Sequence, residues 1–272
     1  MSDASRVLDR DLGQRRFGRV NWLGTWTLLC REVARFMNVW TQTIGAPLIT
    51  AGLFIMIFTI AVGPDRGPVM GVPFLTFIAP GILTMTVIQN AFANTSSSIA
   101  GAKIQGNIVD TLMPPLSAGE LVAGYLAGAV ARGLLIGVGI AIAAWLYLGV
   151  GMQNVAMVLV FVVLGSILMG GLGLLAGIYA NKFDQLAAIQ NFIVTPLAFL
   201  SGTFYSIDAL PGALQVASHI NPIFYVIDGV RHGMIGVSDS PPLRGVVILL
   251  AYCVAVVWVC WFWLKRGYRL KP

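Results

Sequence analysis

The sequence alternates between long apolar stretches and short polar segments. Six stretches of about 20 residues or more carry few or no charges, which is the length an α-helix needs to cross a hydrocarbon core of about 30 Å. They fall at residues 43–62, 74–94, 119–148, 154–180, 185–205 and 245–264. The pattern predicts an all-α membrane protein with six transmembrane helices, which we expect to form a single domain over residues 1–272.

The segment before the first span, residues 20–41, is apolar on one side. The apolar stripe of a helix drawn there holds Trp22, Trp26, Leu29, Val33, Phe36, Met37 and Trp40, with Arg31, Arg35 and Asn38 opposite. Tryptophan is enriched where hydrocarbon meets water, so we expect an interfacial helix lying along the membrane. The alternative is a core-facing helix of a small cytosolic domain, for which the 19 preceding residues are too few.

Composition supports the membrane assignment. Hydrophobic residues make up 57% and charged residues 10% of the chain, against roughly 45–50% and 25% in soluble domains. The net charge of +6 comes mainly from basic residues near the two ends. Because Lys-rich and Arg-rich loops stay in the cytoplasm, we expect both termini there, in contact with anionic membrane lipids and not with nucleic acid. The three cysteines lack metal-ligand spacing, so no metal site is predicted.

The loop after the second span, residues 99–117, combines polar and apolar positions at helical spacing, as in a short amphipathic helix. The apolar stripe is Ile104, Ile108 and Leu112, and the polar stripe is Lys103, Asn107 and Asp110. Pro114 and Pro115 end this helix, and Ser117 with Glu120 forms a predicted capping box that starts the third span. From the residues alone, the segment is either a lever that transmits a push into the membrane or a terminated loop without a partner.

Two blocks resemble the permeases of type-2 ABC exporters, the membrane subunits of ATP-binding-cassette systems that export glycans, lipids, drugs or antibiotics. They are GNIVDTLMPPLSAGELVAGY at 106–125 and LPGALQVASHINPIFYVIDGVRHGM at 210–234. The resemblance implies a bacterial inner-membrane exporter with two permease copies, expected to be a homodimer, and a separate ABC ATPase subunit.

The resemblance also implies that the elbow at 99–117 contacts the ATPase subunit. The positions expected to make or shape this coupling contact are Lys103, Asn107, Asp110, Pro115, Ser117 and Glu120. Many relatives carry an extra charged residue where Ile104 and Gln105 stand here, so the contact chemistry departs from theirs at these positions.

Residues 206–240 are too broken to span a membrane and too apolar for a simple loop, so we predict an external re-entrant helical hairpin. Asp208 can cap its first helix, and Asn221, followed by a proline, can start the second. Asp228 and Arg231 are three residues apart and can pair. The resemblance makes this pair a candidate external gate, and the alternative is a surface ion pair worth under about 1 kcal/mol.

Several polar side chains fall inside the predicted spans. Those assigned to the pathway or to helix packing are Gln89, Asn90, Arg132, Gln190 and Asn191. An arginine near the middle of the membrane costs about 2.5–3.5 kcal/mol on insertion scales. Arg132 should therefore face a partner helix, water or an anionic group, or reach a lipid headgroup. The amides either pair between helices or line a pathway, and such a lining favours an amphipathic cargo over a small ion.

The sequence lacks the G-x-x-x-x-G-K-[ST] motif, so ATP and Mg²⁺ are expected on the partner subunit, and this chain is expected to bind no cofactor. An ion-coupled secondary transporter is the first alternative, but its usual acid within a span is not evident. An intramembrane enzyme is the second. Its candidate residues would be Ser201, Ser218, His219, Asp228 and His232, but their spacing does not require it and no catalytic residue is assigned.

Overall fold

The structure, a computed structural model, describes residues 20–61 and 67–270. Residues 1–19, 62–66 and 271–272 of the predicted domain, which include residue 62 of the predicted first span, lie outside the described residues. Within residues 20–61 and 67–270, six helical segments are long and apolar enough to cross a membrane, which confirms the six predicted spans by length and composition. They are Thr41–Ala61, Phe74–Ile104, Ala118–Leu148, Val155–Tyr179, Phe183–Leu200 and Pro242–Arg266.

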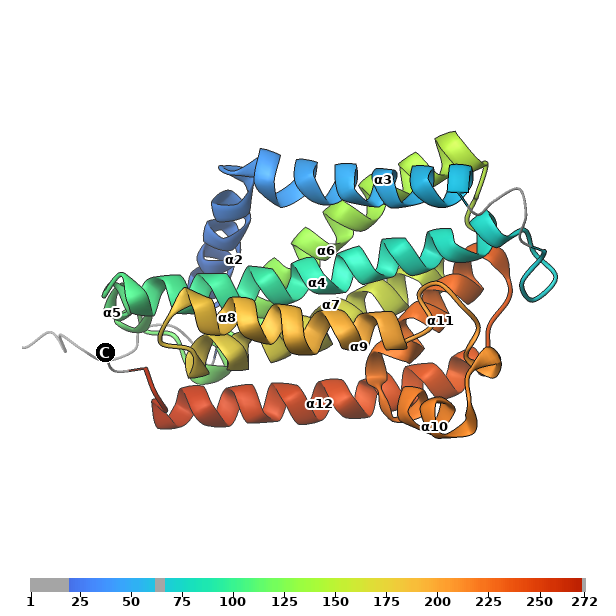
Figure 1. Ribbon diagram of the computed structural model, residues 1–272. Helices are drawn as coiled ribbons and strands as arrows, with labels where there is room; N and C mark the ends of the chain where they lie inside the picture. The colour runs from blue at the N-terminus through green and yellow to red at the C-terminus, as the bar shows by residue number, and fades with distance from the viewer. Residues whose placement is uncertain (1–19, 62–66, 271–272) are drawn as a thin grey trace, which may run out of the picture.

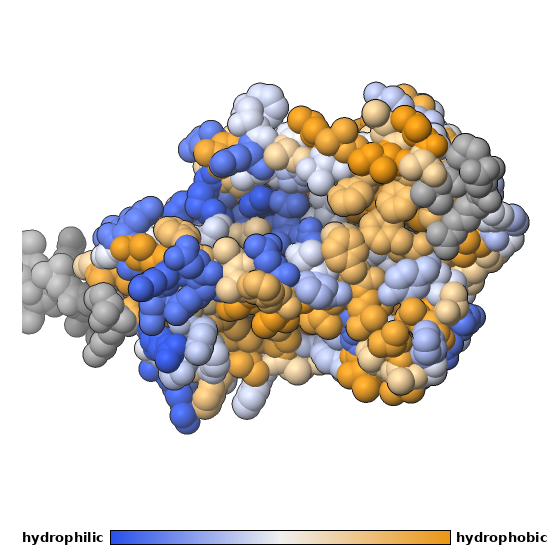
Figure 2. Space-filling model, in the orientation of Figure 1, coloured by the Kyte–Doolittle hydropathy of each residue, from blue (hydrophilic) through white to orange (hydrophobic). Residues whose placement is uncertain are grey.

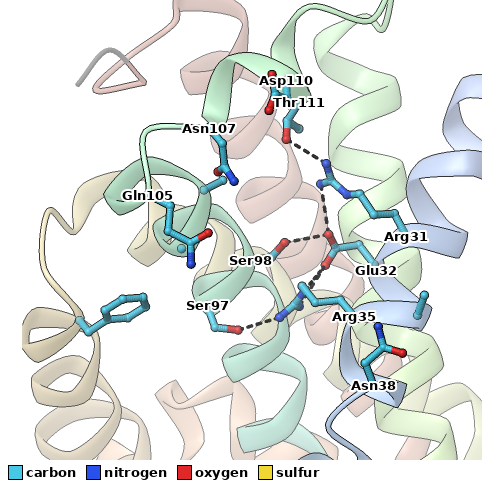
Figure 3. Close-up of a pocket in the computed structure, with 14 residues that line it drawn as sticks. Arg31, Glu32, Arg35, Asn38, Ser97, Ser98, Gln105, Asn107, Asp110 and Thr111 are labelled. Carbon is cyan, nitrogen blue, oxygen red and sulfur yellow. Dashed lines mark hydrogen bonds and ion pairs between the residues drawn. The ribbon is translucent and has the colours of Figure 1, made fainter.

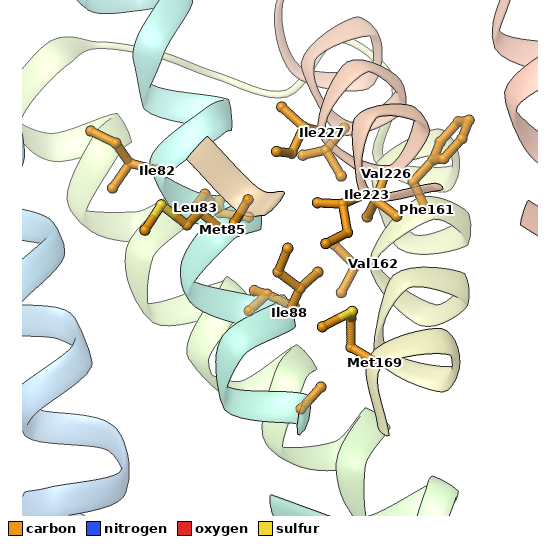
Figure 4. Packing of buried hydrophobic residues seen from close by; sticks show 14 of the residues in the cluster. Ile82, Leu83, Met85, Ile88, Phe161, Val162, Met169, Ile223, Val226 and Ile227 are labelled. Carbon is orange, nitrogen blue, oxygen red and sulfur yellow. The ribbon is translucent and has the colours of Figure 1, made fainter. Parts of the chain in front are cut away.

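The core of the bundle is the pair α4 (Phe74–Ile104) and α7 (Val155–Tyr179), packed against α6 (Ala118–Leu148) and α11 (Pro222–Ile235). Figure 1 shows α4, α7 and α12 (Pro242–Arg266) running in nearly the same direction. Aliphatic and aromatic side chains of α4, α7 and α11 interdigitate between these helices (Figure 4). This packing gives the bundle a largely apolar core.

Two glycines let α7 approach α4 closely. A Cβ atom added to Gly173 would lie 2.3 Å from the carbonyl oxygen of Phe92, and one added to Gly177 would lie 2.8 Å from that of Ser96. Helices in membranes associate through such small residues because lipid provides little hydrophobic driving force between them. The contact between α4 and α7 therefore depends on backbone-to-backbone proximity.

Two spans pack loosely at the edge of the bundle. The π-helical turn η1 (Thr41–Gly45) leads into α3 (Ala46–Ala61), and the other span consists of α8 (Phe183–Ile189), η2 (Gln190–Val194) and α9 (Thr195–Leu200). Figure 1 shows α3 separated from α4 over much of its length. Both spans leave large apolar side chains exposed: Ile49, Leu53, Met56, Ile57, Ile60, Phe192 and Ile193. These surfaces fit lipid or another protein.

The helix α2 (Trp22–Met37) runs across the long helices (Figure 1), which is the direction of the membrane plane if those helices span it. Trp22 and Trp26 are exposed, as an interfacial helix requires. Leu28, Glu32 and Phe36, spaced four residues apart, are buried. The line of residues that packs against the bundle therefore runs between the predicted apolar and charged faces, and it contains an acid.

The predicted pair of short helices between the fifth and sixth spans is present as α10 (Gly212–Ile220) and α11. Asn221 caps α11 as predicted, since its Oδ1 accepts a hydrogen bond of 3.0 Å from the backbone N–H of Ile223. Asp208 does not cap α10, because it lies in the separate 3₁₀ turn η3 (Ile207–Ala209) and α10 begins after Pro211. Nearly every residue of α11 is buried.

The glycine contact is tested by Gly173→Ala with Gly101→Ala as a matched control, since a Cβ at Gly101 meets nothing within 4 Å. We expect Gly173→Ala to lower the free energy of unfolding by about 1–3 kcal/mol through overpacking. Gly101→Ala should be neutral or slightly stabilising, because alanine favours helix. Unfolding titrations in detergent micelles check both, and equal stabilities would contradict the close-packing account.

Candidate functional site

The elbow between α4 and α6 is broken into two parts. Gly106 has a φ of +75°, a left-handed conformation that glycine adopts readily, and it ends α4. A short helix, α5 (Ile108–Leu112), follows. The predicted continuous helix from 99 to 112 is therefore wrong, and its apolar stripe is divided: Ile108 is buried, whereas Ile104 is exposed.

The predicted capping box at the start of α6 is confirmed. Ser117 Oγ accepts from the backbone N–H of Glu120 at 3.4 Å, and Glu120 Oε2 accepts from the backbone N–H of Ser117 at 2.6 Å. The other oxygen, Oε1, accepts from the backbone N–H of Asn21 at 2.6 Å. Asn21 in turn caps α2 through Gly24. Glu120 thus joins the first turns of α2 and α6.

The polar stripe predicted that Lys103 shares a surface with Asn107 and Asp110. The structure places Lys103 elsewhere. Its Nζ donates to the carbonyl oxygens of Ile178 and Ala180 at the end of α7. A cation is favourable there because the last carbonyls of a helix lack partners and carry partial negative charge. Asn107 and Asp110 remain exposed at the elbow, and so do Pro115 and Ser117.

A buried acid that the sequence reasoning missed lies at the centre of the polar contacts. Glu32 on α2 accepts hydrogen bonds from Ser98 at 2.7 Å, from Arg31 at 3.3 Å and from Arg35 at 3.1 Å (Figure 3). Its side chain has no exposed surface. A Cβ at Gly128 of α6 would lie 2.7 Å from Glu32 Cβ, so a glycine leaves the room that the acid needs.

The two arginines extend this network to α5, α6 and α4. Arg31 donates to Thr111 Oγ1 on α5 at 2.9 Å and to the hydroxyl of Tyr125 on α6 at 3.2 Å. Arg35 donates to Asn94 Oδ1 on α4 at 2.9 Å and to Ser97 Oγ at 3.2 Å. The elbow is therefore connected through side chains to the core helix α4.

A signal for this cluster was present in the sequence. Glu32 stands four residues from both Leu28 and Phe36, on one face of a helix, with arginines one residue before it and three after it. An acid on the packed face of a membrane-associated helix requires cationic partners.

An open cleft of about 650 Å³ lies beside this cluster, between α2, α4, α5 and the start of α8. Figure 2 shows hydrophilic side chains gathered in a hollow bounded by α2, α3 and α4. The cleft is lined by residues that include Arg31, Arg35, Asn38, Ser97, Gln105 and Asp110. The cleft therefore offers cationic donors from arginine, an anionic acceptor from aspartate, and neutral polar groups from serine and amide side chains.

Further along α4, the structure brings together two of the predicted pathway residues. Arg132 on α6 is 7% exposed, and its Nη2 donates to Asn90 Oδ1 at 2.7 Å. Gln89 donates to Thr195 of α9 at 3.4 Å. Gln190 and Asn191 lie in the π turn η2, where within the described residues their side chains make no hydrogen bond. The predicted pathway residues therefore do not form one group. Arg132 pairs with Asn90, Gln89 pairs with Thr195, and Gln190 and Asn191 lie apart in η2.

At the opposite end of the bundle, Arg231 is fully buried. It lies 3.8 Å from Asp228 and 3.4 Å from Asp239, donates to the carbonyl of Gly202, and stacks with its guanidinium 4.1 Å from the centre of the Phe77 ring. The predicted pairing with Asp228 is confirmed, but the surface alternative is wrong because both groups are buried. Asp239 was not predicted.

The electrostatics of this cluster are set by burial. Asp228 also accepts from the backbone N–H groups of Asp239 at 2.7 Å and Ser240 at 2.9 Å. Burial raises the pKa of Asp228 above its ordinary value, while the Asp239 N–H and the charge of Arg231 act in the opposite direction.

The serines considered for catalysis have other partners. Ser201 Oγ donates to the carbonyl of Leu197, and Ser218 Oγ donates to that of Leu200. The ring of His219 packs edge-on against Phe224. His232 Nδ1 is hydrogen-bonded to Ser238 Oγ at 3.3 Å. Among the described residues, neither imidazole is therefore hydrogen-bonded to Ser201 or Ser218, as a general base for them would be.

The six long apolar helices of the described residues, with buried charges between them and an elbow helix at one end, define a multi-pass membrane protein. The family model described as ABC-2 type transporter matches residues 24–235, and the chain belongs to this family. It is 37% identical to the inner membrane transport permease YadH of Escherichia coli K12 over 250 residues, 92% of this chain and 98% of YadH. It is 26% identical to nodulation protein J of Rhizobium leguminosarum bv. viciae over 258 residues, 92% and 95% of the two chains.

These relationships establish the chain as a multi-pass inner-membrane permease, the transmembrane subunit of an ABC transporter without an ATPase domain of its own. In ABC transporters generally, ATP is handled by a partner ATPase subunit, and a permease of this kind associates with one. Membership of this family favours transport driven by ATP over the ion-coupled carrier and the intramembrane enzyme.

The Glu32 cluster is tested by Glu32→Gln. The change leaves two arginines without a carboxylate, and because both are partly exposed we expect a loss of about 2 kcal/mol in unfolding free energy, below the roughly 3–5 kcal/mol of a fully buried pair. Adding Arg35→Gln should recover part of this loss. Unfolding titrations of the single and double variants provide the double-mutant cycle, and strictly additive losses would argue against the ion pair.

The buried cluster around Arg231 is tested by Arg231→Gln, with exposed Arg244→Gln at the same end as control. We expect a loss of about 3–5 kcal/mol for the first because Asp228 and Asp239 remain buried without a cation. The control should change stability by less than about 0.5 kcal/mol. Thermal unfolding in detergent compares them, and similar melting temperatures would refute this assignment.

Proposed function

We propose that this permease is the membrane subunit of an ATP-driven exporter that moves an amphipathic, lipid-linked, glycan or drug-like molecule out of the cytoplasm. The observation that carries the proposal is the side-chain path from the elbow to the core. It runs from Thr111 through Arg31 and Glu32 to Ser98 on α4. A force applied to α5 would reach a core helix through these hydrogen-bonded groups. Separating Glu32 from its partners is costly because the carboxylate is fully buried.

The elbow end is proposed to face the cytoplasm. Figure 1 places α5 and the C-terminal end of α12 at the same end of the bundle. Lys265 and Arg266 end α12 there, and the basic residues of the N-terminal segment precede α2. The excess of basic residues in cytoplasmic segments supports this orientation, with both termini inside the cell.

The exposed surface of the elbow is proposed to receive the ATPase subunit. Val109 and Met113 are 51% and 76% exposed, and Asn107 and Asp110 are exposed beside them. Apolar side chains flanked by polar ones are typical of a protein-binding surface. Pro115, Ser117 and Glu120 would hold this surface at a set angle to α6, and Lys103 would fix the end of α4 behind it.

A second copy of the permease is proposed to complete the pathway, as the family resemblance implied. The amide of Asn191 is exposed in the middle of the loosely packed fifth span, beside the exposed ring of Phe192. A bare amide facing hydrocarbon is unfavourable, so this surface is expected to face another permease copy or the cargo. The homodimer would then place Gln190 and Asn191 along the pathway.

The hairpin of α10 and α11 is proposed to close the external end. Arg231 joins α11 to Gly202, which follows the fifth span, and to Asp239, which precedes α12. Opening at this end would require these contacts to rearrange together. Asp228 and Arg231 are therefore proposed as gate residues that hold the closed state.

The coupling proposal is tested by Asp110→Lys, with Asp184→Lys as the matched control. Both acids are exposed, and Asp184 lies at the start of α8 near the same end of the bundle. If α5 receives the ATPase, reversing the charge at Asp110 should reduce co-purification of the ATPase subunit and permease-dependent ATP hydrolysis at least about tenfold. Asp184→Lys should change both by less than about twofold.

Thermal unfolding of the permease alone should be the same for both variants, because neither acid has a side-chain partner within the described residues. Equal ATPase binding and hydrolysis for wild type and Asp110→Lys would remove α5 from the interface. Loss in the control alone would move the contact to α8.

A further inference from the structure

The arginines between α2, α4 and α6 outnumber the acids that neutralise them. Arg31 and Arg35 both bond to Glu32, and both oxygens of Glu32 are occupied by Ser98 and these two arginines. Asp110 also lines the cleft, but it is exposed at the elbow, where water screens its charge. The cluster therefore keeps a net positive charge on the side that faces the core.

Arg132 adds a second uncompensated charge. It is 7% exposed, its one hydrogen-bond partner is the neutral amide of Asn90, and its Nε has no partner. Within residues 20–61 and 67–270, no carboxylate lies within 4.0 Å of its guanidinium. A buried guanidinium without a counter-ion is strongly unfavourable, so this position is incomplete in the chain by itself.

Arg132 does not line the cleft itself, but α4 connects it to Arg35, a residue that does. The partner of Arg132, Asn90, lies four residues along α4 from Asn94, which binds Arg35, and four residues correspond to about 6 Å along the helix. Arg35 lines the cleft. The buried Nδ2 of Asn94 also lacks an acceptor. Beside two neighbouring turns of α4, two buried donors thus lack an acceptor within the described residues: Arg132 Nε of α6 and Asn94 Nδ2 of α4 itself.

We propose that Arg35 and Arg132 bind the anionic headgroup, phosphate or carboxylate, of an amphipathic molecule that enters through this cleft. Guanidinium groups match the paired oxygens of such anions, and the surrounding low dielectric strengthens each contact. The inference rests on the proposed export function for the identity of the occupant, which is the cargo. A membrane lipid headgroup carries the same chemistry, and the experiment separates the two.

The site is tested with the permease–ATPase complex in nanodiscs of phosphatidylcholine. Radiolabelled dodecyl phosphate is the anionic probe, dodecyl maltoside is the neutral one, and empty nanodiscs correct for partitioning. Arg132→Gln should weaken dodecyl phosphate binding at least about tenfold, Arg132→Lys should retain most of it, and maltoside binding should not change. Arg266→Gln, which removes an equal charge from the end of α12, is the control and should bind as wild type.

A second variant keeps the test decisive if Arg132→Gln fails to fold. Asn90→Asp supplies Arg132 with a counter-ion from within the chain, so thermal stability should stay equal or rise while dodecyl phosphate binding falls at least about tenfold. Wild-type affinity in Asn90→Asp, or equal losses in Arg132→Gln and Arg266→Gln, would overturn the site.

Phosphatidylglycerol added to the nanodiscs identifies the occupant. If dodecyl phosphate still stimulates ATP hydrolysis when phosphatidylglycerol is present, the site accepts cargo. If phosphatidylglycerol displaces dodecyl phosphate without changing the rate of hydrolysis, a lipid fills the site and the cargo assignment is overturned. Intact ATPase coupling with no preference for the anionic probe refutes only this inference. Intact probe binding in a permease that recruits no ATPase refutes only the proposed function.

Discussion

A carboxylate buried against two arginines is the interaction on which the elbow end of this protein depends. Glu32 is fully buried, and without Arg31, Arg35 and Ser98 its charge would be too costly to keep between helices. These partners belong to α2 and α4, and Gly128 of α6 leaves the space in which they meet. The acid therefore sets the position of α2 on the bundle, and through Arg31 it holds α5 as well.

The two ends of the bundle use the same physical device for different purposes. Arg231 holds α11 to the segments on both sides of it, as Glu32 holds α2 to α4. Each cluster concentrates charge where helices must stay together, while α3 and the fifth span expose apolar surfaces and pack loosely. Ion contacts to buried groups resist separation, because a charge left without its partner in a low-dielectric interior is costly.

Local signals were interpreted correctly where a few neighbouring residues decide the outcome. The capping box of Ser117 and Glu120, the proline end of the elbow and the Asn221 cap depend on backbone groups within a few positions. The continuous helix from 99 to 112 failed because one glycine outweighed the apolar periodicity. Lys103 was misplaced because its acceptors, at Ile178 and Ala180, are 75 and 77 residues away.

The sequence by itself determined the membrane class, the six spans and the family resemblance, because span length, hydropathy and basic flanks act locally along the chain. The tertiary structure decided which polar groups meet. Arg132 and Asn90 are 42 residues apart, and Glu120 and Asn21 are 99 apart, so their contacts follow from how helices face one another. Periodicity shows which side of a helix is polar, but only packing supplies the partner. In the part of the chain that the structure describes, packing leaves Arg132 without a carboxylate partner.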